Sequence, residues 1–118
     1  MIEIEIKRVY EPSSSDDGYR VLVDRLWPRG VKKSDANIDE WQRDCAPSTD
    51  LRNWFAHRPE NWTRFKRLYG QELEAHLEEI TGFVSRAGNR PITLVYGAKN
   101  EQQNQAVVLK RFIQSRVF

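Results

Sequence analysis

The sequence feature that most constrains the fold is an apolar stripe running from Trp62 to Ile80. Its members recur at spacings of three and four residues, which predicts a long helix with one face against a core. Pro59 can begin this helix and Gly88 can end it, whereas Gly70 lies inside the stripe and predicts a kink or a break near that position. The stripe comprises Trp62, Phe65, Tyr69, Leu73, Leu77 and Ile80, and we expect Phe65, Tyr69 and Leu73 to face the core.

Strands are predicted on both sides of this helix. Near the N-terminus, Ile2, Ile4 and Ile6 alternate with charged residues, which indicates a strand with one buried face, a pattern that suits a sheet edge. Residues 19–24 and 91–97 have continuous apolar centres, which predicts strands that are buried on both faces. Because a long helix separates these strands, the chain is expected to form a small α/β domain with a mostly parallel sheet.

Three further segments complete the predicted elements. Residues 38–43 fit either one helical turn or a short third strand. Residues 48–55 predict a short helix that Ser48 or Thr49 can cap, and the last helix has an apolar face that includes Leu109 and Ile113. The length of 118 residues suits one domain, residues 1–118.

Composition narrows the classes of protein that this chain can belong to. No apolar run is long enough to span a membrane, and the N-terminus lacks the apolar block of a signal peptide, so a cytoplasmic location is the expectation. The single cysteine, Cys45, allows no intramolecular disulfide. His57 and His76 have no cysteine cluster near them, so we expect neither a metal site nor a cofactor.

Polar residues follow both buried strands at their carboxyl ends. Asp24 and Arg25 end the first strand, and the chain continues to Arg29 and Gly30. The second strand ends in Tyr96 and Gly97 and is followed by Lys99, in a polar loop that leads to the last helix. Ligands of open α/β sheets collect at this edge, and the two ends converge if the strands are parallel neighbours.

The residue types at this edge suit an anionic ligand. Arg25 and Arg29 carry planar, permanently charged groups that match phosphate or carboxylate. Gly97 allows the backbone to approach a ligand closely, and the N-terminus of the last helix favours an anion. Tyr96 and Trp27 can stack on a flat ring, and Asp24 can orient an arginine, bind a hydroxyl group or act as a base.

Structural roles compete with these functional ones. Asp24 and Arg25 can form a cap and a surface ion pair, and Tyr96 and the tryptophans can belong to the core. His57 is either a structural hydrogen-bonding residue or an acid/base, and Ser48 is more readily a helix cap than a nucleophile. Cys45 would be a reactive thiol only beside an activating partner. The candidate catalytic residues are therefore Asp24, His57 and Tyr96, without a short motif that specifies a reaction.

Phrases along most of the chain resemble a bacterial family of unknown function, the YeaO-like proteins. They are "GYRVLVDRLWPRG", "IDEW", "APSTDLRNWF" and "ITLVYGAKNEQQNQAVVL", together with the histidine at 57. The resemblance covers residues 5–113 and implies a single, cytosolic, three-layer α/β domain of Rossmann-like character. The recurrent polar positions of the family fall on Asp24, Arg25, Arg29, Gly30, Ser48, His57, Tyr96 and Lys99.

Two positions depart from the pattern of that family. Asn100 stands where an acid is usual, and Gln103 stands where a histidine is usual, whereas Asn104 is retained. If the usual acid and histidine are catalytic in relatives, catalysis by this chain is in doubt. If they only bind a ligand, amides can replace them through hydrogen bonds.

The leading hypothesis is a domain that binds a phosphate-bearing or nucleotide-like ligand, as a hydrolase or a transferase. Arg25 and Arg29 would hold the anion with Gly30, Ser48 and Gly97 nearby, Asp24 and Tyr96 would position it, and Lys99 with Asn104 would close the site. A first alternative is a non-catalytic module that binds nucleic acid or a protein through the basic stretch 20–33. A second alternative is a purely structural role, in which the motif locks the fold.

Overall fold

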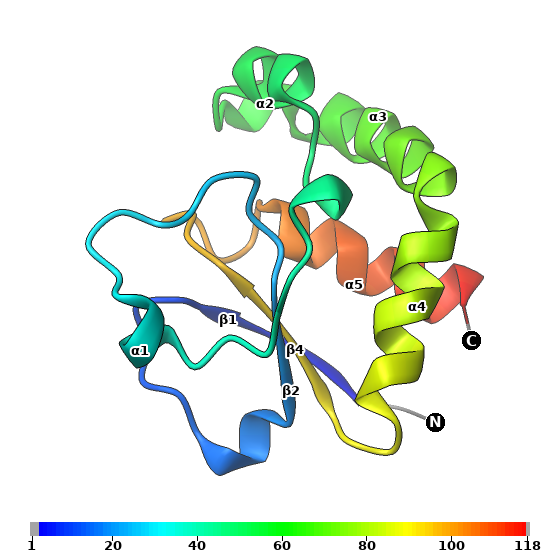
Figure 1. Cartoon of the computed structure of the whole chain (residues 1–118). Coiled ribbons are helices and arrows are strands. Elements are labelled where there is room, and N and C mark those ends of the chain that lie inside the picture. Colours follow the sequence, from blue (N-terminus) through cyan, green and yellow to red (C-terminus); the bar gives the residue numbers. More distant parts are fainter. Residues whose placement is uncertain (1–2, 118) are drawn as a thin grey trace.

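A computed structural model describes residues 3–117, which form one four-stranded sheet and the helices that cover it (Figure 1). The strands are β1 (Ile4–Arg8), β2 (Tyr19–Leu22), β3 (Glu40–Trp41) and β4 (Ile92–Tyr96), in the order β1-β4-β2-β3. Every pairing is parallel. The predicted α/β class with a parallel sheet is therefore confirmed, and β1 lies at an edge as expected.

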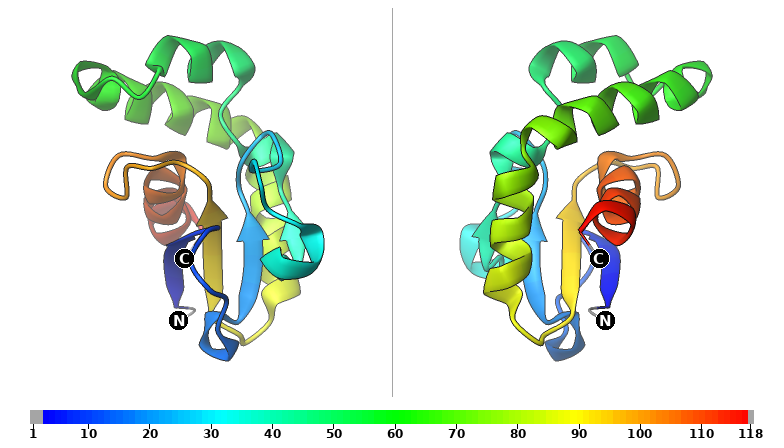
Figure 2. Two further views of the ribbon diagram at one scale, coloured as in Figure 1. Left: turned by 90° about the vertical axis from the view of Figure 1, so that its left-hand side faces the viewer. Right: turned by 90° about the vertical axis from the view of Figure 1, so that its right-hand side faces the viewer.

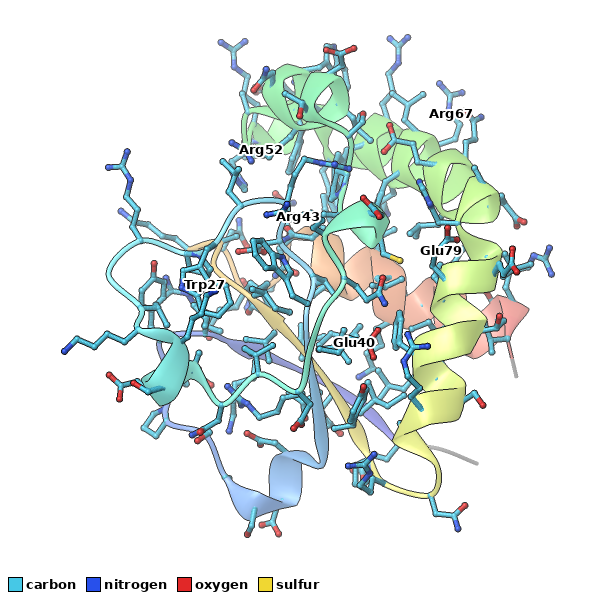
Figure 3. The ribbon with its side chains drawn as sticks, viewed as in Figure 1. Trp27, Glu40, Arg43, Arg52, Arg67 and Glu79 are labelled. Atoms are coloured by element: carbon cyan, nitrogen blue, oxygen red, sulfur yellow. The ribbon has the colours of Figure 1, made fainter. Side chains whose placement is uncertain are left out.

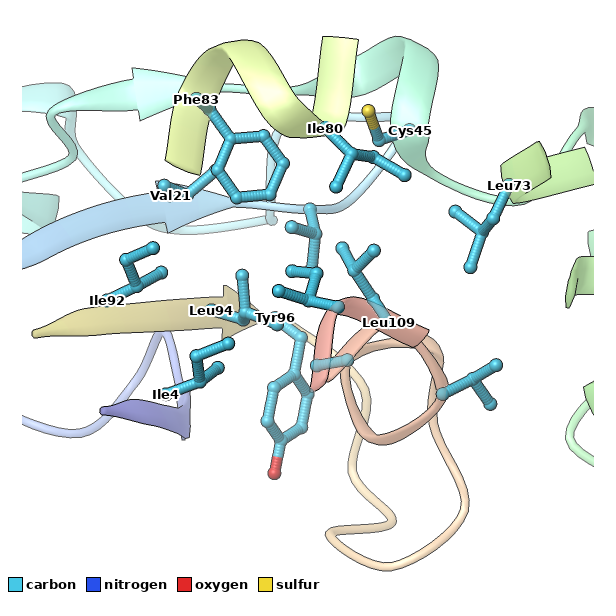
Figure 4. Packing of buried hydrophobic residues seen from close by; sticks show 14 of the residues in the cluster. Ile4, Val21, Cys45, Leu73, Ile80, Phe83, Ile92, Leu94, Tyr96 and Leu109 are labelled. Carbon is cyan, nitrogen blue, oxygen red and sulfur yellow. The ribbon is translucent and has the colours of Figure 1, made fainter. Parts of the chain in front are cut away.

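The two faces of the sheet are covered differently. Helices α4 (Leu77–Ala87) and α5 (Gln105–Arg116) lie on one face, and the chain after β2 with the short helix α1 (Lys33–Ala36) lies on the other (Figure 2). The larger core fills the space under α4 and α5, where Val21 and Leu94 meet Ile80, Phe83 and other apolar side chains (Figure 4). A smaller cluster on the second face joins Leu22 and Val95 to the partly buried Trp27 and Trp41.

Helices α2 (Thr49–Phe55) and α3 (Trp62–Ala75) extend beyond the carboxyl edge of the sheet (Figure 2). The side chain of Ser48 caps α2, because its Oγ accepts a hydrogen bond from the Leu51 N–H at 3.2 Å. Phe65, Tyr69 and Leu73 are buried, as the apolar stripe predicted. Short 3₁₀ turns span Ser15–Asp17, Arg43–Cys45 and Pro59–Asn61, the last of them directly before α3.

The predicted break in the long helical pattern is displaced from Gly70 to His76. Gly70 lies inside the regular helix α3, and the chain turns at His76, whose φ of −114° and ψ of 23° separate α3 from α4. The prediction at Gly70 was wrong because a single glycine lowers helix stability without ending the helix. Gly88 follows the last residue of α4 with a φ of 64°, as expected for a glycine at a helix end.

The structure also settles two boundaries. Of the two interpretations of residues 38–43, the strand is found, as β3. Strand β2 ends at Leu22 rather than Asp24, although the Val23 N–H still donates to the Val95 carbonyl at 2.9 Å. Asp24 therefore stands just outside the sheet. Within the described residues, no helix is both long and apolar enough to cross a membrane.

Candidate functional site

The carboxyl ends of β2 and β4 converge, as predicted for parallel neighbours. Leu22 pairs with Val95 in the register of the two strands. Just beyond them, the Gly97 N–H donates a hydrogen bond to Asp24 Oδ2 at 2.9 Å. A Cβ atom at position 97 would lie only 2.8 Å from the same oxygen, so this close approach favours glycine. The two polar strand ends are thus joined by a direct contact.

A cavity of about 390 Å³ opens at this edge of the sheet. Four parts of the chain line it: Tyr10 after β1, the loop after β2, the region of helices α2 and α3, and the segment from Gly97 to the start of α5. Figure 3 shows Arg52 on α2 and Trp27 on the loop, on two of these parts. The charged and polar residues that line the cavity include Asp24, Arg25, Arg29, Arg52, His57 and Gln105.

Among residues 3–117, Asp24 is the only carboxylic acid that lines the cavity. Its Oδ2 accepts the Gly97 N–H, and its Oδ1 accepts a hydrogen bond from Gln105 Nε2 at 2.5 Å. Burial raises the pKa of Asp24 to about 6, although the Gly97 N–H, the charge of Arg52 and Gln105 act in the opposite direction. The proposed ion pair between Asp24 and Arg25 is absent from the described residues, because neutral donors hold this carboxyl group instead.

Arg25 holds the backbone on the far side of the cavity. Its Nε donates to the Pro47 carbonyl at 2.9 Å, and its Nη2 donates to the Ala46 carbonyl at 3.1 Å. These bonds fix the plane of the guanidinium group and use one of its edges. The Nη1 atom has no hydrogen bond to protein in the part of the chain that the structure describes, so it can still donate to an anion.

Arg29 and Arg52 line the same cavity with exposed side chains. Within residues 3–117 neither guanidinium group is in a salt bridge or a hydrogen bond. The loop that carries Arg29 is held by its backbone, because the Tyr10 hydroxyl donates to the Arg29 carbonyl at 3.0 Å. Gly30 follows with a φ of 74°, so its part in the predicted site is the turn.

His57 also reaches the cavity, from the chain just beyond α2. Its backbone is in the left-handed region with a φ of 54°, and its ring is tilted against Phe55 at 5.4 Å between centroids. Trp27, by contrast, has an evident structural role. Its Nε1 donates to the Val31 carbonyl at 2.7 Å, and its ring meets the edge of Trp41 at 5.5 Å.

Besides Gly30, four predicted site residues lie away from the cavity lining. Tyr96 is 2% exposed and belongs to the core, and burial raises the pKa of its phenol. Ser48 Oγ caps α2 and donates to Glu72 Oε2 at 2.6 Å. Lys99 is exposed outside the cavity lining. Asn104 is fully buried and caps α5, because its Oδ1 accepts the Val107 N–H at 3.1 Å.

The two departures from the family pattern lie in the loop before α5. Asn100 Oδ1 accepts hydrogen bonds from the backbone N–H groups of Gln102 and Gln103, each at 2.9 Å. A carboxylate at position 100 could accept the same two bonds, so the amide preserves this turn. Both side chains lie outside the cavity lining.

Several lining residues escaped the sequence analysis. Arg52 and Gln105 come from helices that were assigned only by their apolar faces, and Tyr10 lies beyond the first strand. The spacing of Arg52 from Leu51 and Phe55 places it off the buried face of α2, which is the one signal that the sequence contained. Residues 3–117 contain no cluster of three or more histidine, cysteine, aspartate or glutamate side chains that could hold a metal ion.

This chain is similar over nearly its whole length to several uncharacterized proteins. The uncharacterized protein YeaO of Escherichia coli is 45% identical over 114 residues, covering 97% of this chain and 99% of its own. The uncharacterized proteins Mb3100c of Mycobacterium bovis and Rv3073c of Mycobacterium tuberculosis are each 37% identical over 115 residues, covering 96% of this chain and 95% of their own. No solved structure matches. Residues 3–117 match the family described as the inactive DUF488-N3 subclade, and the chain belongs to that family of YeaO-like proteins of unknown function.

Proposed function

We propose that this protein binds a small phosphate-bearing or nucleotide-like anion in the cavity at the carboxyl edge of its sheet. The observation that carries the proposal is the charge of the lining: three arginines, Arg25, Arg29 and Arg52, line the same cavity as a single acid, Asp24, among the described residues. A cavity of about 390 Å³ is of the size that takes a small ligand. Guanidinium groups match phosphate oxygens in planar geometry.

The apolar part of the lining favours an anion that is attached to a flat or hydrophobic body. Tyr10 and Leu26 are 50% and 61% exposed, although large apolar side chains are usually covered, and both line this cavity. Such a rim can cover a ring while the arginines hold its charged group. A nucleotide-like ligand combines both features.

Binding without turnover is better supported than the hydrolase or transferase hypothesis. The subclade to which the chain belongs is described as inactive. In the described part of the chain, no serine, threonine or cysteine lines the cavity. Ser48 is a helix cap, and Cys45 is fully buried with its pKa raised to about 12 by burial. Asp24 and His57 are the remaining candidates for a general base.

A nucleic-acid module that uses the basic stretch 20–33 has less support. Arg20 is 4% exposed, and its Nη1 lies 2.6 Å from Asp17 Oδ2 in a salt bridge. Arg25 is partly buried and donates to two backbone carbonyls, so the stretch presents fewer exposed donors than its sequence suggests. Lys32 and Lys33 remain exposed.

A thermal-shift series with inorganic phosphate, pyrophosphate and nucleoside diphosphates tests the proposal. At 100 times its dissociation constant a ligand stabilises the folded state by roughly 2.7 kcal/mol, which gives a clear rise in Tm. Arg52→Gln should weaken binding about tenfold or more, because it removes a charged donor from the cavity. Arg111→Gln is the matched control, since Arg111 is exposed on α5 outside the lining.

The proposal would be contradicted by the absence of a shift with every probe, or by an equal loss of binding in the Arg52→Gln and Arg111→Gln variants. The same variants with a fluorescent single-stranded oligonucleotide test the alternative. Salt-sensitive binding that depends on Lys32 and Lys33 rather than Arg52 would favour the nucleic-acid module.

A further inference from the structure

We infer that the cavity takes up its anion together with one proton, which the Asp24 carboxyl group carries. The inference rests on the proposed function and adds a specificity determinant to it. The site would accept a fully ionised anion well only when the carboxyl group of Asp24 is protonated. It begins from the position of this acid, inside the arginine-lined cavity rather than beside it.

The contacts of Asp24 hold the carboxyl group in place without requiring its negative charge. Each oxygen accepts a hydrogen bond from an uncharged donor, the Gly97 N–H at 2.9 Å and the Gln105 amide at 2.5 Å. Within residues 3–117 Asp24 is in no salt bridge. A carboxyl oxygen has two lone pairs, so a neutral Asp24 can keep these bonds and use its proton as a donor.

Charged and titratable groups approach Asp24 from each element around it. The loop of Asp24 itself contributes Arg25 and Arg29, and the α2 region contributes Arg52 and His57. From α3, the buried Tyr69 lies close enough to Asp24 for the charge of Asp24 to contribute to raising the pKa of the Tyr69 phenol. The Tyr69 hydroxyl donates a hydrogen bond to the Cys45 carbonyl. From β3 the Trp41 Nε1 donates to the Asp24 backbone carbonyl, and α5 presents only the neutral Gln105.

An anion that enters this cavity meets three favourable charges and one unfavourable charge. Repulsion from an ionised Asp24 is removed when a proton from solution binds the carboxylate, and the resulting O–H can donate to the anion. Burial has already raised the pKa of Asp24 to about 6, so protonation near neutral pH requires little further energy. Anion binding and proton binding at Asp24 therefore favour each other.

The coupling has a measurable form. If only the protonated site binds well, the affinity for an anion of constant charge falls about tenfold for each pH unit above the pKa of Asp24. A ligand with its own hydroxyl group or acidic proton can donate to the carboxylate instead and would show weaker pH dependence. Probes for the test must therefore keep one charge across the pH range.

The experiment is calorimetric titration with inorganic sulfate and with phenyl sulfate, neither of which changes charge between pH 5.5 and 8. Titration at pH 7 in two buffers of different ionisation enthalpy should report uptake of close to one proton for each anion bound. Affinity should fall by about 50-fold between pH 6 and pH 8. The Asp24→Asn variant should bind without proton uptake and with an affinity that changes little over this range.

Two further variants identify the group that takes up the proton. Histidine side chains also change charge between pH 5 and 8, so His57→Gln is required, and proton uptake should persist in it. Asp50→Asn is the matched control, because Asp50 is an exposed acid on α2 outside the cavity lining. If Asp24→Asn does not fold, the carboxyl ¹³C signal of Asp24 in the unmodified protein replaces it, and its pKa should rise when sulfate is added.

The possible outcomes separate this inference from the proposed function. Sulfate binding without proton uptake, uptake that is lost in His57→Gln, or an Asp24 pKa unchanged by sulfate would each overturn the inference and leave anion binding intact. Failure of both sulfates to bind at any pH would also overturn the inference. The phosphate and nucleotide series would then decide the proposed function separately.

Discussion

The carboxyl group of Asp24 is half-buried at the edge of a cavity where arginines outnumber acids, yet uncharged donors hold it. Its ionised form is therefore less stable in the folded protein than in water, which is why burial raises its pKa from the ordinary 3.8 to about 6. The folded state loses stability from this group as the pH rises from about 4 to above 6, because the unfolded chain ionises first. Well below pH 4 the carboxyl group is neutral in both states.

Asp24→Asn should consequently stabilise the protein relative to the unmodified chain only where Asp24 is ionised. The difference in free energy of unfolding should move by about 2.5 kcal/mol in favour of the variant between pH 4 and pH 7.5. Asparagine can still accept the Gly97 N–H, and Gln105 can present its carbonyl oxygen to the new amide. Urea melts at both pH values measure this change, and a pH-independent difference would show that Asp24 has an ordinary pKa.

Some of the predicted site residues line the cavity and others lie elsewhere, for identifiable reasons. Asp24, Arg25, Arg29 and Gly97 could be placed because the carboxyl ends of parallel strands share one edge. Tyr96 was expected in the site, but it lies in the core. Side chains alternate along a strand, so Tyr96 shares the face of Ile92 and Leu94, which is the core face. Arg52 could not be placed, because its position in the cavity depends on how α2 lies over the sheet.

At the scale of elements, the long helical stripe was predicted in type and burial but not in its break. Phe65 stacks on Phe55 at 4.2 Å between ring centroids, so the stripe connects α3 to α2 above the cavity. The break at His76 has no glycine or proline to signal it. The capping residues Ser48 and Asn104 were interpreted as possible ligand contacts, since the same polar side chains serve both purposes.

Gly70 and Gly88 offer a matched pair of substitutions on these helices. A Cβ at Gly70 would meet nothing within 4 Å, so Gly70→Ala should stabilise the protein by about 0.5–1 kcal/mol through helix propensity. Gly88→Ala should destabilise it by about 1 kcal/mol, because Gly88 has a φ of 64° at the end of α4. Denaturant melts compare the two variants, and a loss of stability in Gly70→Ala would mean that α3 is distorted at that position.

At the scale of the whole molecule, the fold brings distant segments to one opening. Because β2 and β4 are parallel neighbours, residues 24–29 and 97–105 lie at the same edge of the sheet. Helices α2 and α3 lie beyond this edge and contribute to the cavity lining (Figure 1). The basic charge of this opening arises only in three dimensions, since Arg52 is far from Arg25 in sequence and Arg20, in the basic stretch, is buried. The net charge of +2 gives no indication of it.

The most direct test of anion binding at this opening is a two-dimensional ¹H–¹⁵N NMR titration of the protein with pyrophosphate. Binding in the cavity predicts saturable shifts of the Gly97 amide, the Gln105 side-chain amide and the Nε–H signals of Arg25 and Arg52. Signals of Lys32, Lys33 and Arg111, which lie outside the cavity lining, should remain in place. Shifts that are absent from the cavity, or that centre on Lys32 and Lys33, would contradict an anion site at the carboxyl edge of the sheet.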